Sequence, residues 1–456
     1  MRSNPSLLLP NVLDSRSFDP GEQNGVYRYL CNMSGITAGP CQVSQRGHVR
    51  YLSGAGACIR AREIRLMGIV SLVGTAREEL VARAASIADE VAGVHAHEVD
   101  RDARFPVEAL DALREAGLLS ALVPQEFGGA GATMSQVADM TRVLGAHCSS
   151  TALVFAIHNM QVACVVRHGE TPWLRDFLAE LAESQLLLGS ASAERSTGGN
   201  LRTSLCALQC SSGRFRLQKN SPAISFGAYA DAILTTARRS PESAPADQVL
   251  VVCRAPGLTL EQTSESETLG LRGMCSAGFT LYATGDVEQI VPGAFSTISA
   301  TTLLPAAHVL CSAVWLGIAT AAVERARHFL RAQARKKPGV TPFGAERLAE
   351  VLALTQQLTE LVNGSARHLD AVSDNPRQLE ALSFAIAMNN LQVSSSTMLV
   401  DIVGRALTIC GLAGYRLDTV HSLSRLLRDA YGAALVVNNN RILAENARML
   451  LIAKEY

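Results

Sequence analysis

The last third of the chain constrains the fold most, because it repeats one long helical pattern four times. From about residue 303 to the end, apolar residues recur at spacings of three and four over stretches longer than an ordinary helix. Pro338-Gly339 ends the first stretch, and short polar links separate the later ones. Because helices joined by short links lie antiparallel to their neighbours, we expect residues 296–456 to form a four-helix bundle.

Two blocks of different character precede the bundle. Residues 67–185 also carry helical spacing, with Pro106 near one helix start and Gly117 near a helix end. Between residues 186 and 295 the pattern changes to short runs separated by turn residues, such as "GRFRLQK" and "DQVLVVCRA", which are typical of strands. The sequence therefore predicts an α+β protein with an N-terminal helical domain, a middle β-domain and a C-terminal helical bundle.

The first 66 residues differ in composition from the rest. They contain eight arginines, no lysine and four acidic residues, without sustained apolar periodicity. An abrupt change of composition indicates an appended segment. We expect residues 1–66 to be a poorly ordered N-terminal extension, or the result of an over-long start with Met67 as the alternative initiator.

Composition argues against several classes of function. Basic and acidic residues balance at 41 each, and Lys and Arg form no run of the kind that marks a nucleic-acid surface. The longest apolar runs are much shorter than the roughly 20 residues that a membrane span needs. The eleven cysteines are scattered singly, without the spacing of a zinc site. We expect a soluble, cytoplasmic protein with reduced thiols and without nucleic-acid, membrane or metal partners.

Five short segments, in this order, carry a resemblance to a known family. They are "VPQEFGGAG" (123–131), "SAERSTGGNL" (192–201), "LGLRGMCS" (269–276), "WLGIATAAVERA" (315–326) and "ICGLAGYRLDTVHSLSRLLRDA" (409–430). Each alone indicates little, since Gly-rich pieces also form tight turns. Together, inside a helix–strand–helix frame, they make residues 75 to 456 resemble the acyl-CoA dehydrogenase family.

The resemblance implies a cofactor, a reaction and partners. Members of the family bind FAD between the β-domain and the bundle, usually with help from a neighbouring subunit, and assemble as homodimers or homotetramers. They oxidise the CH–CH group of an acyl thioester, here acyl-CoA or a carrier-bound acyl group. A carboxylate removes the α-proton while the β-hydrogen leaves as hydride to the flavin. The electrons then pass to an electron-transfer partner.

Candidate binding residues follow from the resemblance position by position. Ser192 and Ala193 stand where the family's chain meets the pyrimidine edge of the flavin, and Ser225 keeps a hydroxyl that can reach flavin N5. Arg335 would pair with the cofactor pyrophosphate across a subunit contact. The candidate cofactor-binding residues are Ser192, Ala193, Ser225, Arg335, Gly411 and Asn439, and the candidate substrate-binding residues are His158, Gly199 and His308.

Other residues near these positions have simpler expected roles. The family's aromatic wall beside the flavin is missing at Ala223, with Phe226 as a candidate substitute. Glu194 would order the loop beneath the flavin. Asp429 would be structural, and the Arg428-Asp429 pair by default a solvated helix pair.

The catalytic base is the point at which the sequence departs from the family. The usual glutamate falls at Val437, and a second family position for it falls at Ala307. Neither residue is an acid, so Val437 could contribute only its backbone N–H to the thioester carbonyl. His308, next to Ala307, becomes the leading candidate base, because an imidazole can accept a proton near neutral pH.

Three functions stay open on these grounds. The first is an acyl-thioester dehydrogenase whose base has moved to His308. The second is a flavin-dependent monooxygenase on the same fold, in which reduced flavin reacts with O2 and no carbanion-forming carboxylate is needed. The third is a non-catalytic acyl-binding or scaffold subunit.

Overall fold

The computed structural model describes residues 41–43, 49–51, 78–195 and 200–453. The chain divides into two compact units, Met1–Ser71 and Leu72–Tyr456. In the first unit, strand β1 (Cys41–Val43) pairs antiparallel with β2 (Val49–Tyr51). The predicted N-terminal extension otherwise lies outside the described residues.

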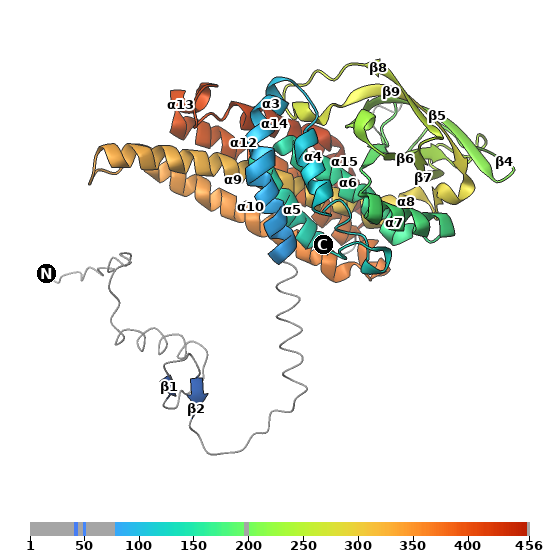
Figure 1. Cartoon of the computed structure of the whole chain (residues 1–456), viewed down its shortest axis with the longest axis horizontal. Helices are drawn as coiled ribbons and strands as arrows, with labels where there is room; N and C mark the ends of the chain where they lie inside the picture. Colours follow the sequence, from blue (N-terminus) through green and yellow to red (C-terminus); the bar gives the residue numbers. More distant parts are fainter. Residues whose placement is uncertain (1–40, 44–48, 52–77, 196–199, 454–456) are drawn as a thin grey trace. The chain divides into compact units, whose positions relative to one another are not determined.

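The second unit begins with a helical layer (Figure 1). A helix starting at residue 78 runs through the π-helical turn η1 (Ala88–Ala92) into α3 (Gly93–Arg101). The Thr133 hydroxyl accepts the Gln136 backbone N–H, which fixes the start of α5. The helices that follow α3 are α4 (Val107–Glu115), α5 (Met134–His147), α6 (Ser149–His168) and α7 (Pro172–Ser184).

The middle of the chain forms two four-stranded sheets. The first has the order β10-β7-β6-β3. Strand β3 (Leu188–Ala191) pairs parallel with β6 (Ala232–Arg238). Strand β6 pairs antiparallel with β7 (Gln248–Arg254), which in turn pairs antiparallel with β10 (Ile290–Val291). The second is antiparallel with the order β4-β5-β9-β8. Its strands are β4 (Gln209–Ser211), β5 (Arg214–Ile224), β8 (Leu258–Ser264) and β9 (Ala277–Asp286).

Burial patterns show how the two sheets are covered. Strand β5 alternates buried and exposed residues, as expected for a strand with one solvent face. Strands β6 and β7 are buried along almost their whole length. Their side chains divide between a core shared with the second sheet and a core shared with the helices.

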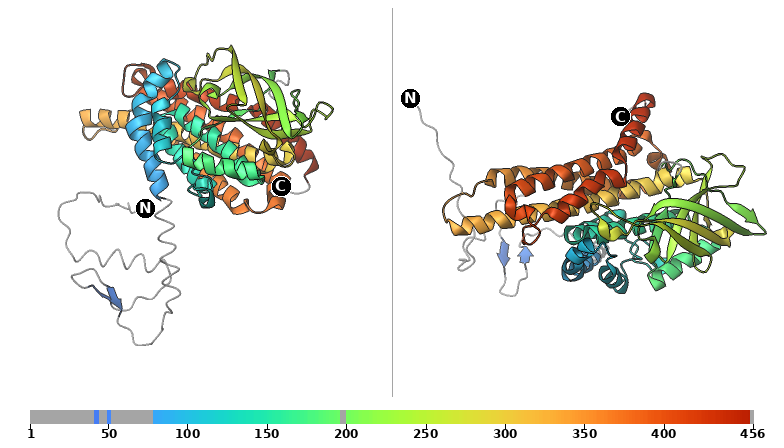
Figure 2. Two further views of the ribbon diagram at one scale, coloured as in Figure 1. Left: turned by 45° about the vertical axis from the view of Figure 1, so that its right-hand side comes forward. Right: turned by 90° about the horizontal axis from the view of Figure 1, so that it is seen from above.

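Long helices form the C-terminal bundle (Figure 2). Its central member, α9 (Leu304–Lys336), packs against α5, α10 (Ala345–Val372) and α12 (Leu382–Cys410). Gly317 allows the close crossing with α5, because a Cβ atom there would lie 2.5 Å from the Arg142 carbonyl oxygen. The shorter elements are α8 (Phe295–Ile298), η7 (Ser299–Leu303), α11 (Pro376–Leu379), α13 (Leu412–Tyr415), α14 (Ser424–Val436) and α15 (Asn439–Ile452).

The last helical stretch differs from the sequence prediction. One continuous helix was expected, but the structure breaks it into α14 and α15 at Val437 and Asn438. Val437 has extended backbone angles, and the Asn438 side chain accepts the Arg441 backbone N–H at 3.2 Å. A β-branched pair followed by asparagines favours such a break, because Asn readily caps a new helix. The break lies at the position predicted for the family's base.

Three helices are long and apolar enough, by length and composition alone, to cross a membrane. They are Ser149–His168, Phe295–Lys336 and Leu382–Cys410. In the first two, 89% of the apolar window is buried inside the protein, against 44% in the third. A helix packed on every side is apolar all round, so packing accounts for the composition of the first two. The sequence reading missed them because it considered only unbroken apolar runs.

Candidate functional site

Neither of the two expected base positions carries a carboxylate, since they are occupied by Val437 and Ala307. Val437 directly follows the last residue of α14, is half-buried and packs against the main hydrophobic core. Ala307, in the first turn of α9, packs against the same core and is also half-buried. An aliphatic side chain can neither accept nor donate a proton, so any general base must come from a neighbouring residue.

His308 is the titratable side chain nearest in sequence to Ala307. It is 1% exposed, and neither ring nitrogen has a hydrogen-bond partner among the described residues. Burial lowers the pKa of His308 to about 4, and the nearby Asn389 amide partly offsets this effect. The imidazole is therefore uncharged at neutral pH. A buried polar group without partners costs stability, so its presence calls for a functional explanation.

A chain of amides lies beside His308 and joins α12 to α15. Asn389 donates its Nδ2 hydrogen to Oδ1 of Asn446 at 2.7 Å. Asn446 in turn donates its Nδ2 hydrogen to Oδ1 of Asn390 at 2.9 Å. We call Asn389, Asn446 and Asn390 the amide chain. It connects the start of the bundle's third long helix with the helix that follows the break at Val437.

Two buried amide oxygens near the break, one on α15 and one on α12, are also without hydrogen-bond partners among the described residues. Asn439 donates to the Ser396 hydroxyl at 2.9 Å, but its Oδ1 is unpaired. Gln392 donates to the Ala433 carbonyl oxygen at 3.2 Å, and its Oε1 is unpaired as well. Both atoms could accept hydrogen bonds from a ligand's N–H or O–H groups. Flavins and thioester arms supply such donors, so this donor and acceptor set fits them.

Hydroxyl groups gather where the two sheets meet. The Ser190 and Ser192 hydroxyls lie 3.0 Å apart, and the Ser225 and Ser276 hydroxyls lie 2.9 Å apart. The Ala193 carbonyl oxygen accepts a hydrogen bond from Ser221 at 3.0 Å, which draws the end of β3 onto β5. Ser192, Ala193 and Ser225 are all half-buried. They can therefore offer hydrogen bonds to a flavin ring.

Position 223, where the family has an aromatic residue, carries only a methyl group at this edge. Ala223 is exposed, and Phe226 is fully buried with its ring centroid 6.4 Å from that of Phe105. Phe226 belongs to the main hydrophobic core, and its role as a substitute for the family's aromatic residue stays a prediction.

Glu194 holds the loop that leaves β3. Its carboxylate accepts hydrogen bonds from the Ser204 hydroxyl and from the backbone N–H groups of Leu205 and Cys206, each at 2.9 Å. Further along this loop, Arg202 forms an ion pair with Glu445 of α15 at 2.7 Å. Glu445 directly precedes Asn446 of the amide chain. The β-domain loop thus reaches the part of the bundle that contains His308 and Asn389.

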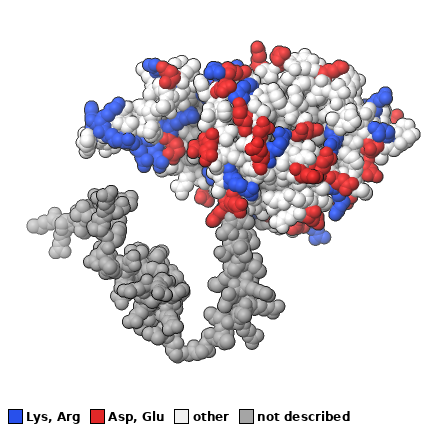
Figure 3. Space-filling model, in the orientation of Figure 1, with Lys and Arg blue, Asp and Glu red and all other residues white. Residues whose placement is uncertain are grey.

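Two candidate cofactor residues lie at the other end of the bundle. Arg335 is exposed near the end of α9, about 27 residues and hence about 40 Å along the helix from His308. Figure 3 shows Lys and Arg side chains gathered at the end where α9 and α10 meet. Gly411 ends α12 with a φ of 55°, in the loop leading to His421, whose ring lies 5.3 Å from that of His328 of α9. The structure does not bring these two residues to His308.

His158 has a different environment from His308, although both are fully buried. Its Nε2 lies 2.6 Å from the Leu119 carbonyl oxygen, and its Nδ1 accepts the Leu188 backbone N–H at 3.0 Å. Burial lowers the pKa of His158 to about 4. Both nitrogens are occupied by backbone groups, so the side chain links α6 to β3, and its role in substrate binding stays a prediction. Gly199 lies outside the described residues.

The Arg428-Asp429 pair is not solvated, in contrast to its default reading. Arg428 pairs with Asp100 of α3, with one contact at 2.9 Å, and also donates to the Leu269 carbonyl oxygen. Asp429 is buried and accepts the Leu271 backbone N–H at 2.6 Å. The pair ties α14 to the helical layer and to the loop before β9. These contacts give Asp429 a structural role, which is the role expected for it from the sequence.

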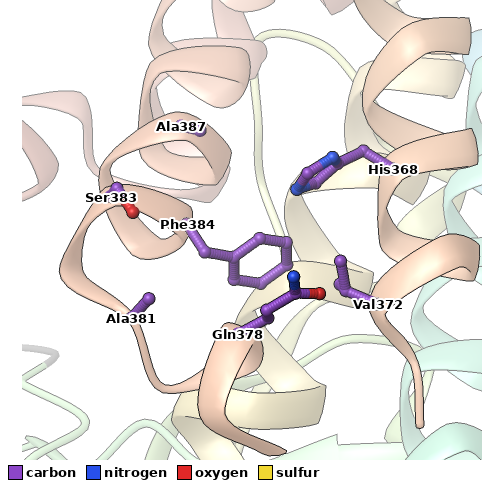
Figure 4. Close-up of a pocket in the computed structure, with 7 residues that line it drawn as sticks. All are labelled: His368, Val372, Gln378, Ala381, Ser383, Phe384 and Ala387. Carbon is purple, nitrogen blue, oxygen red and sulfur yellow. The ribbon is translucent and has the colours of Figure 1, made fainter. Parts of the chain in front are cut away.

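A hollow of about 320 Å³ lies elsewhere, between α10, α11 and the start of α12. Figure 4 shows the Phe384 ring at its centre, pointing toward His368 and Val372. The His368 and Phe384 rings stack at 5.6 Å. None of the residues predicted from the sequence lines it, so we keep it apart from the candidate site.

Two family models match the chain, and together they cover more than half of it. Acyl-CoA dehydrogenase, N-terminal domain, matches residues 75–185, and acyl-CoA dehydrogenase, C-terminal domain, matches residues 298–436. The chain belongs to the acyl-CoA dehydrogenase family. Its helical layer, paired sheets and helical bundle agree with the fold expected from the sequence.

Relatives within the acyl-CoA dehydrogenase family include two kinds of enzyme. Cyclohex-1-ene-1-carbonyl-CoA dehydrogenase of Syntrophus aciditrophicus (strain SB) is 24% identical over 76% of this chain and 82% of its own length. The probable FMNH2-dependent monooxygenase SfnC of Pseudomonas putida is 25% identical over 72% of this chain and 85% of its own. These relatives support a flavin-dependent enzyme.

Solved structures share the acyl-CoA dehydrogenase fold. FMN-bound TdsC from Paenibacillus sp. A11-2 superposes with a TM-score of 0.73 at 18% identity, covering 82% of this chain and 97% of TdsC. The glutaryl-coenzyme A dehydrogenase complex with glutaryl-CoA has a TM-score of 0.69 at 17% identity, covering 82% and 95%. At these identities the likeness shows the fold alone.

Sequence reasoning missed the residues around His308. Asn389, Gln392 and Asn446 were not singled out, although "NNLQVSSS" (389–396) puts several polar residues into an otherwise apolar helix. That pattern also fits a solvated helix face. Burial of Gln392, at 0% exposure, distinguishes the two cases and requires the packed bundle.

Proposed function

We propose that this protein is an FAD-dependent oxidoreductase that dehydrogenates the CH–CH group of an acyl thioester, with His308 as its base. One observation carries the proposal: a fully buried imidazole with two uncommitted nitrogens next to Ala307, a position where the family is expected to place a base. The relation to two CoA-thioester dehydrogenases over 76% of the chain supports the substrate class.

The chemistry assigned to this chain is a proton transfer. A flavin, when bound, takes the β-hydrogen as hydride. The α-proton passes to the unprotonated ring nitrogen of His308, which is neutral at pH 7 because burial lowers its pKa to about 4. The backbone N–H of Val437, at the break between α14 and α15, polarises the thioester carbonyl.

The cofactor residues divide between two subunits. Ser192, Ala193, Ser225 and Asn439 would hold the ring end of the flavin. Arg335 and Gly411 lie too far along the bundle to join them within one chain, so they would hold the adenylate end of a flavin bound to a second copy. This division favours FAD over FMN, because FMN has no adenylate, and it favours a homodimer or homotetramer.

A monooxygenase is the second candidate function. Val437 and Ala307 support it, since a reaction of reduced flavin with O2 needs no carboxylate at either position. The relative SfnC, a probable FMNH2-dependent monooxygenase, supports it as well. In that case His308 would face the substrate without removing a carbon-bound proton.

Exchange of the α-proton tests the proposed base directly. The purified flavoprotein is incubated in D2O with a 3-thia-acyl-CoA, which can lose an α-proton but cannot transfer a β-hydride, and deuterium uptake is followed by mass spectrometry. Wild-type protein is expected to catalyse exchange, and His308→Ala to lower the rate by about 10²- to 10⁴-fold. Equal exchange rates in both proteins would remove His308 from the reaction.

A further inference from the structure

We infer that Ser276 is a positioning residue at the ring end of the flavin site. Its hydroxyl pairs with that of Ser225, and the pair can hydrogen-bond the flavin ring nitrogen N5 in both the oxidised and the reduced state. The inference rests on the proposed function, which places Ser225 at the ring end of the flavin. Ser276 was not among the candidate residues from the sequence.

The contact between the two serines is made in the structure. Their Oγ atoms lie 2.9 Å apart, although the residues are 51 positions apart in the chain. Ser225 directly follows β5, which ends at Ile224, and Ser276 directly precedes β9, which begins at Ala277. Both serines are half-buried, so the pair is not enclosed in the core and a ligand can reach it.

The pairing of the two strands is irregular just before Ser225. The register of β5 on β9 shifts between Ser221 and Ile224. An irregularity of this kind changes the direction in which the following side chains point, and bulges are frequent beside active sites. The strands therefore end in a geometry that brings the side chains of Ser225 and Ser276 together.

Strained backbone flanks the pair on both segments. Phe226, which follows Ser225, has a φ of 43°, and Cys275, which precedes Ser276, has a φ of 46°. Residues other than glycine rarely adopt such left-handed angles, because their Cβ atom crowds the backbone. Strain of this kind persists where the surrounding structure enforces it, and it is concentrated at functional sites. The chain therefore holds these two serines in place at a cost in stability.

A backbone hydrogen bond already joins the two segments. The Phe226 N–H donates to the Met274 carbonyl oxygen at 2.7 Å, without help from the serine side chains. Among the described residues, neither serine hydroxyl has a hydrogen-bond partner other than the opposite hydroxyl. The serine pair thus has hydrogen-bonding capacity that the fold does not use.

A pair of hydroxyls can act toward a ligand either as donor or as acceptor. Two hydroxyls that share one hydrogen bond keep one O–H group free, and each hydroxyl can turn about its C–O bond. If Ser276 donates to Ser225, then Ser225 donates onward to a ligand acceptor. If Ser225 donates to Ser276, then Ser225 accepts from a ligand donor. No heavy atom has to move between these two states.

The flavin ring nitrogen N5 needs both kinds of contact during the proposed reaction. Oxidised N5 has a lone pair and accepts a hydrogen bond, whereas reduced N5 carries a hydrogen and donates one. That hydrogen arrives with two electrons from the β-carbon of the substrate, and the α-proton goes to His308. The serines gain and lose no proton, since only the direction of their O–H groups changes. Ser276 supplies the acceptor that the Ser225 O–H requires once N5 is reduced.

The ratio of reduced to oxidised flavin affinity tests the inference without turnover. Without the Ser276 hydroxyl, Ser225 can still donate to oxidised N5, but its O–H loses its acceptor when N5 is reduced. An unpaired donor costs more than an unpaired lone pair. Ser276→Ala should therefore weaken binding of reduced flavin relative to oxidised flavin on the order of tenfold, which lowers the two-electron midpoint potential by about 30 mV. The potential is measured anaerobically on the purified flavoprotein, without substrate, against a reference dye.

Further variants show whether Ser276 acts through Ser225. Ser276→Thr keeps the hydroxyl and should keep the wild-type potential. In a Ser225→Ala background, Ser276→Ala should cause no additional shift, because the residue through which it acts is gone. Ser424→Ala is the matched control: Ser424 is half-buried at the start of α14, and its hydroxyl lies 3.1 Å from that of Ser422. This control should leave the potential unchanged.

Two outcomes would overturn the inference. One is an affinity ratio in Ser276→Ala within about twofold of wild type, and the other is an equal shift with and without the Ser225 hydroxyl. Ser276→Cys has a similar size but only a weak hydrogen-bonding group, so it should also lower the potential, and it remains measurable if Ser276→Ala fails to fold. The proposed base fails separately. If His308→Ala exchanges the α-proton like wild type while Ser276→Ala lowers the potential, the base is wrong and the serine pair stands.

Discussion

At the scale of single residues, the protein contains a natural comparison between two buried histidines. His158 and His308 are both fully buried, and burial lowers the pKa of each to about 4. His158 binds backbone groups with both ring nitrogens, whereas His308 has no partner among the described residues. A histidine kept for stability should have its ring nitrogens hydrogen-bonded, as His158 has. A histidine kept for chemistry at some cost in stability can lack such partners, as His308 does.

Replacing each histidine by leucine should therefore give opposite results. His158→Leu leaves the Leu119 carbonyl and the Leu188 N–H unpaired and should lower the free energy of unfolding by roughly 2–5 kcal/mol. His308→Leu loses no hydrogen bond and should be neutral, or stabilising by about 1 kcal/mol. Urea unfolding at pH 7.5, about one unit above the histidine pKa of 6.5, measures both. Equal destabilisation by the two substitutions would contradict a functional reading of His308.

The pH dependence of stability adds a second expectation for the same variants. The folded pKa of about 4 lies below the ordinary value of 6.5, so the unfolded chain binds more protons between these two pH values. The free energy of unfolding therefore has its full value, as far as these histidines are concerned, above pH 6.5, and it decreases as the pH falls toward 4. Each leucine variant should flatten this loss, since leucine binds no proton.

At the scale of elements, the sequence predicted which segments are helical or extended better than it predicted where each helix ends. The three-block order and the long helices of the bundle follow from the spacing of apolar residues and agree with the structure. The break at Val437 and Asn438 was missed, because helical spacing continues across it. The amide chain was missed for a different reason: Asn389 and Asn446 lie on separate helices, and only packing of α12 against α15 brings them together.

Helix α9 carries the proposed base His308 near its start and the candidate cofactor residue Arg335 near its end. The role of Arg335 can be tested separately from that of His308. Arg335→Ala should weaken FAD binding about 10- to 100-fold through loss of one charge-assisted contact. Its binding of FMN, which has no pyrophosphate, should stay the same. Lys336→Ala, the neighbouring exposed cation, is the matched control. Titration of flavin-free protein measures all these affinities, and equal FAD affinity in the two variants would remove Arg335 from the cofactor site.

At the scale of the whole molecule, one subunit holds only part of the proposed cofactor site. Apolar side chains are strongly exposed toward the end of the bundle that contains Arg335 and Gly411, including Phe343 at 87%, Leu412 at 80% and Val420 at 80%. Exposed apolar groups of this kind are typical of surfaces that pack against another protein. A second copy covering them would place Arg335 and Gly411 at a neighbour's flavin.

The most direct test of the whole account is anaerobic reduction of the bound flavin by acyl thioesters. A panel of acyl-CoAs is added to the oxidised protein while the visible flavin absorbance is followed, with His308→Ala in parallel. The account predicts bleaching of the wild-type flavin by at least one thioester and at least 10²-fold slower bleaching in the variant. Failure of every thioester to bleach it, together with rapid reaction of the chemically reduced protein with O2 and an oxygenated product, would contradict dehydrogenation and favour the monooxygenase.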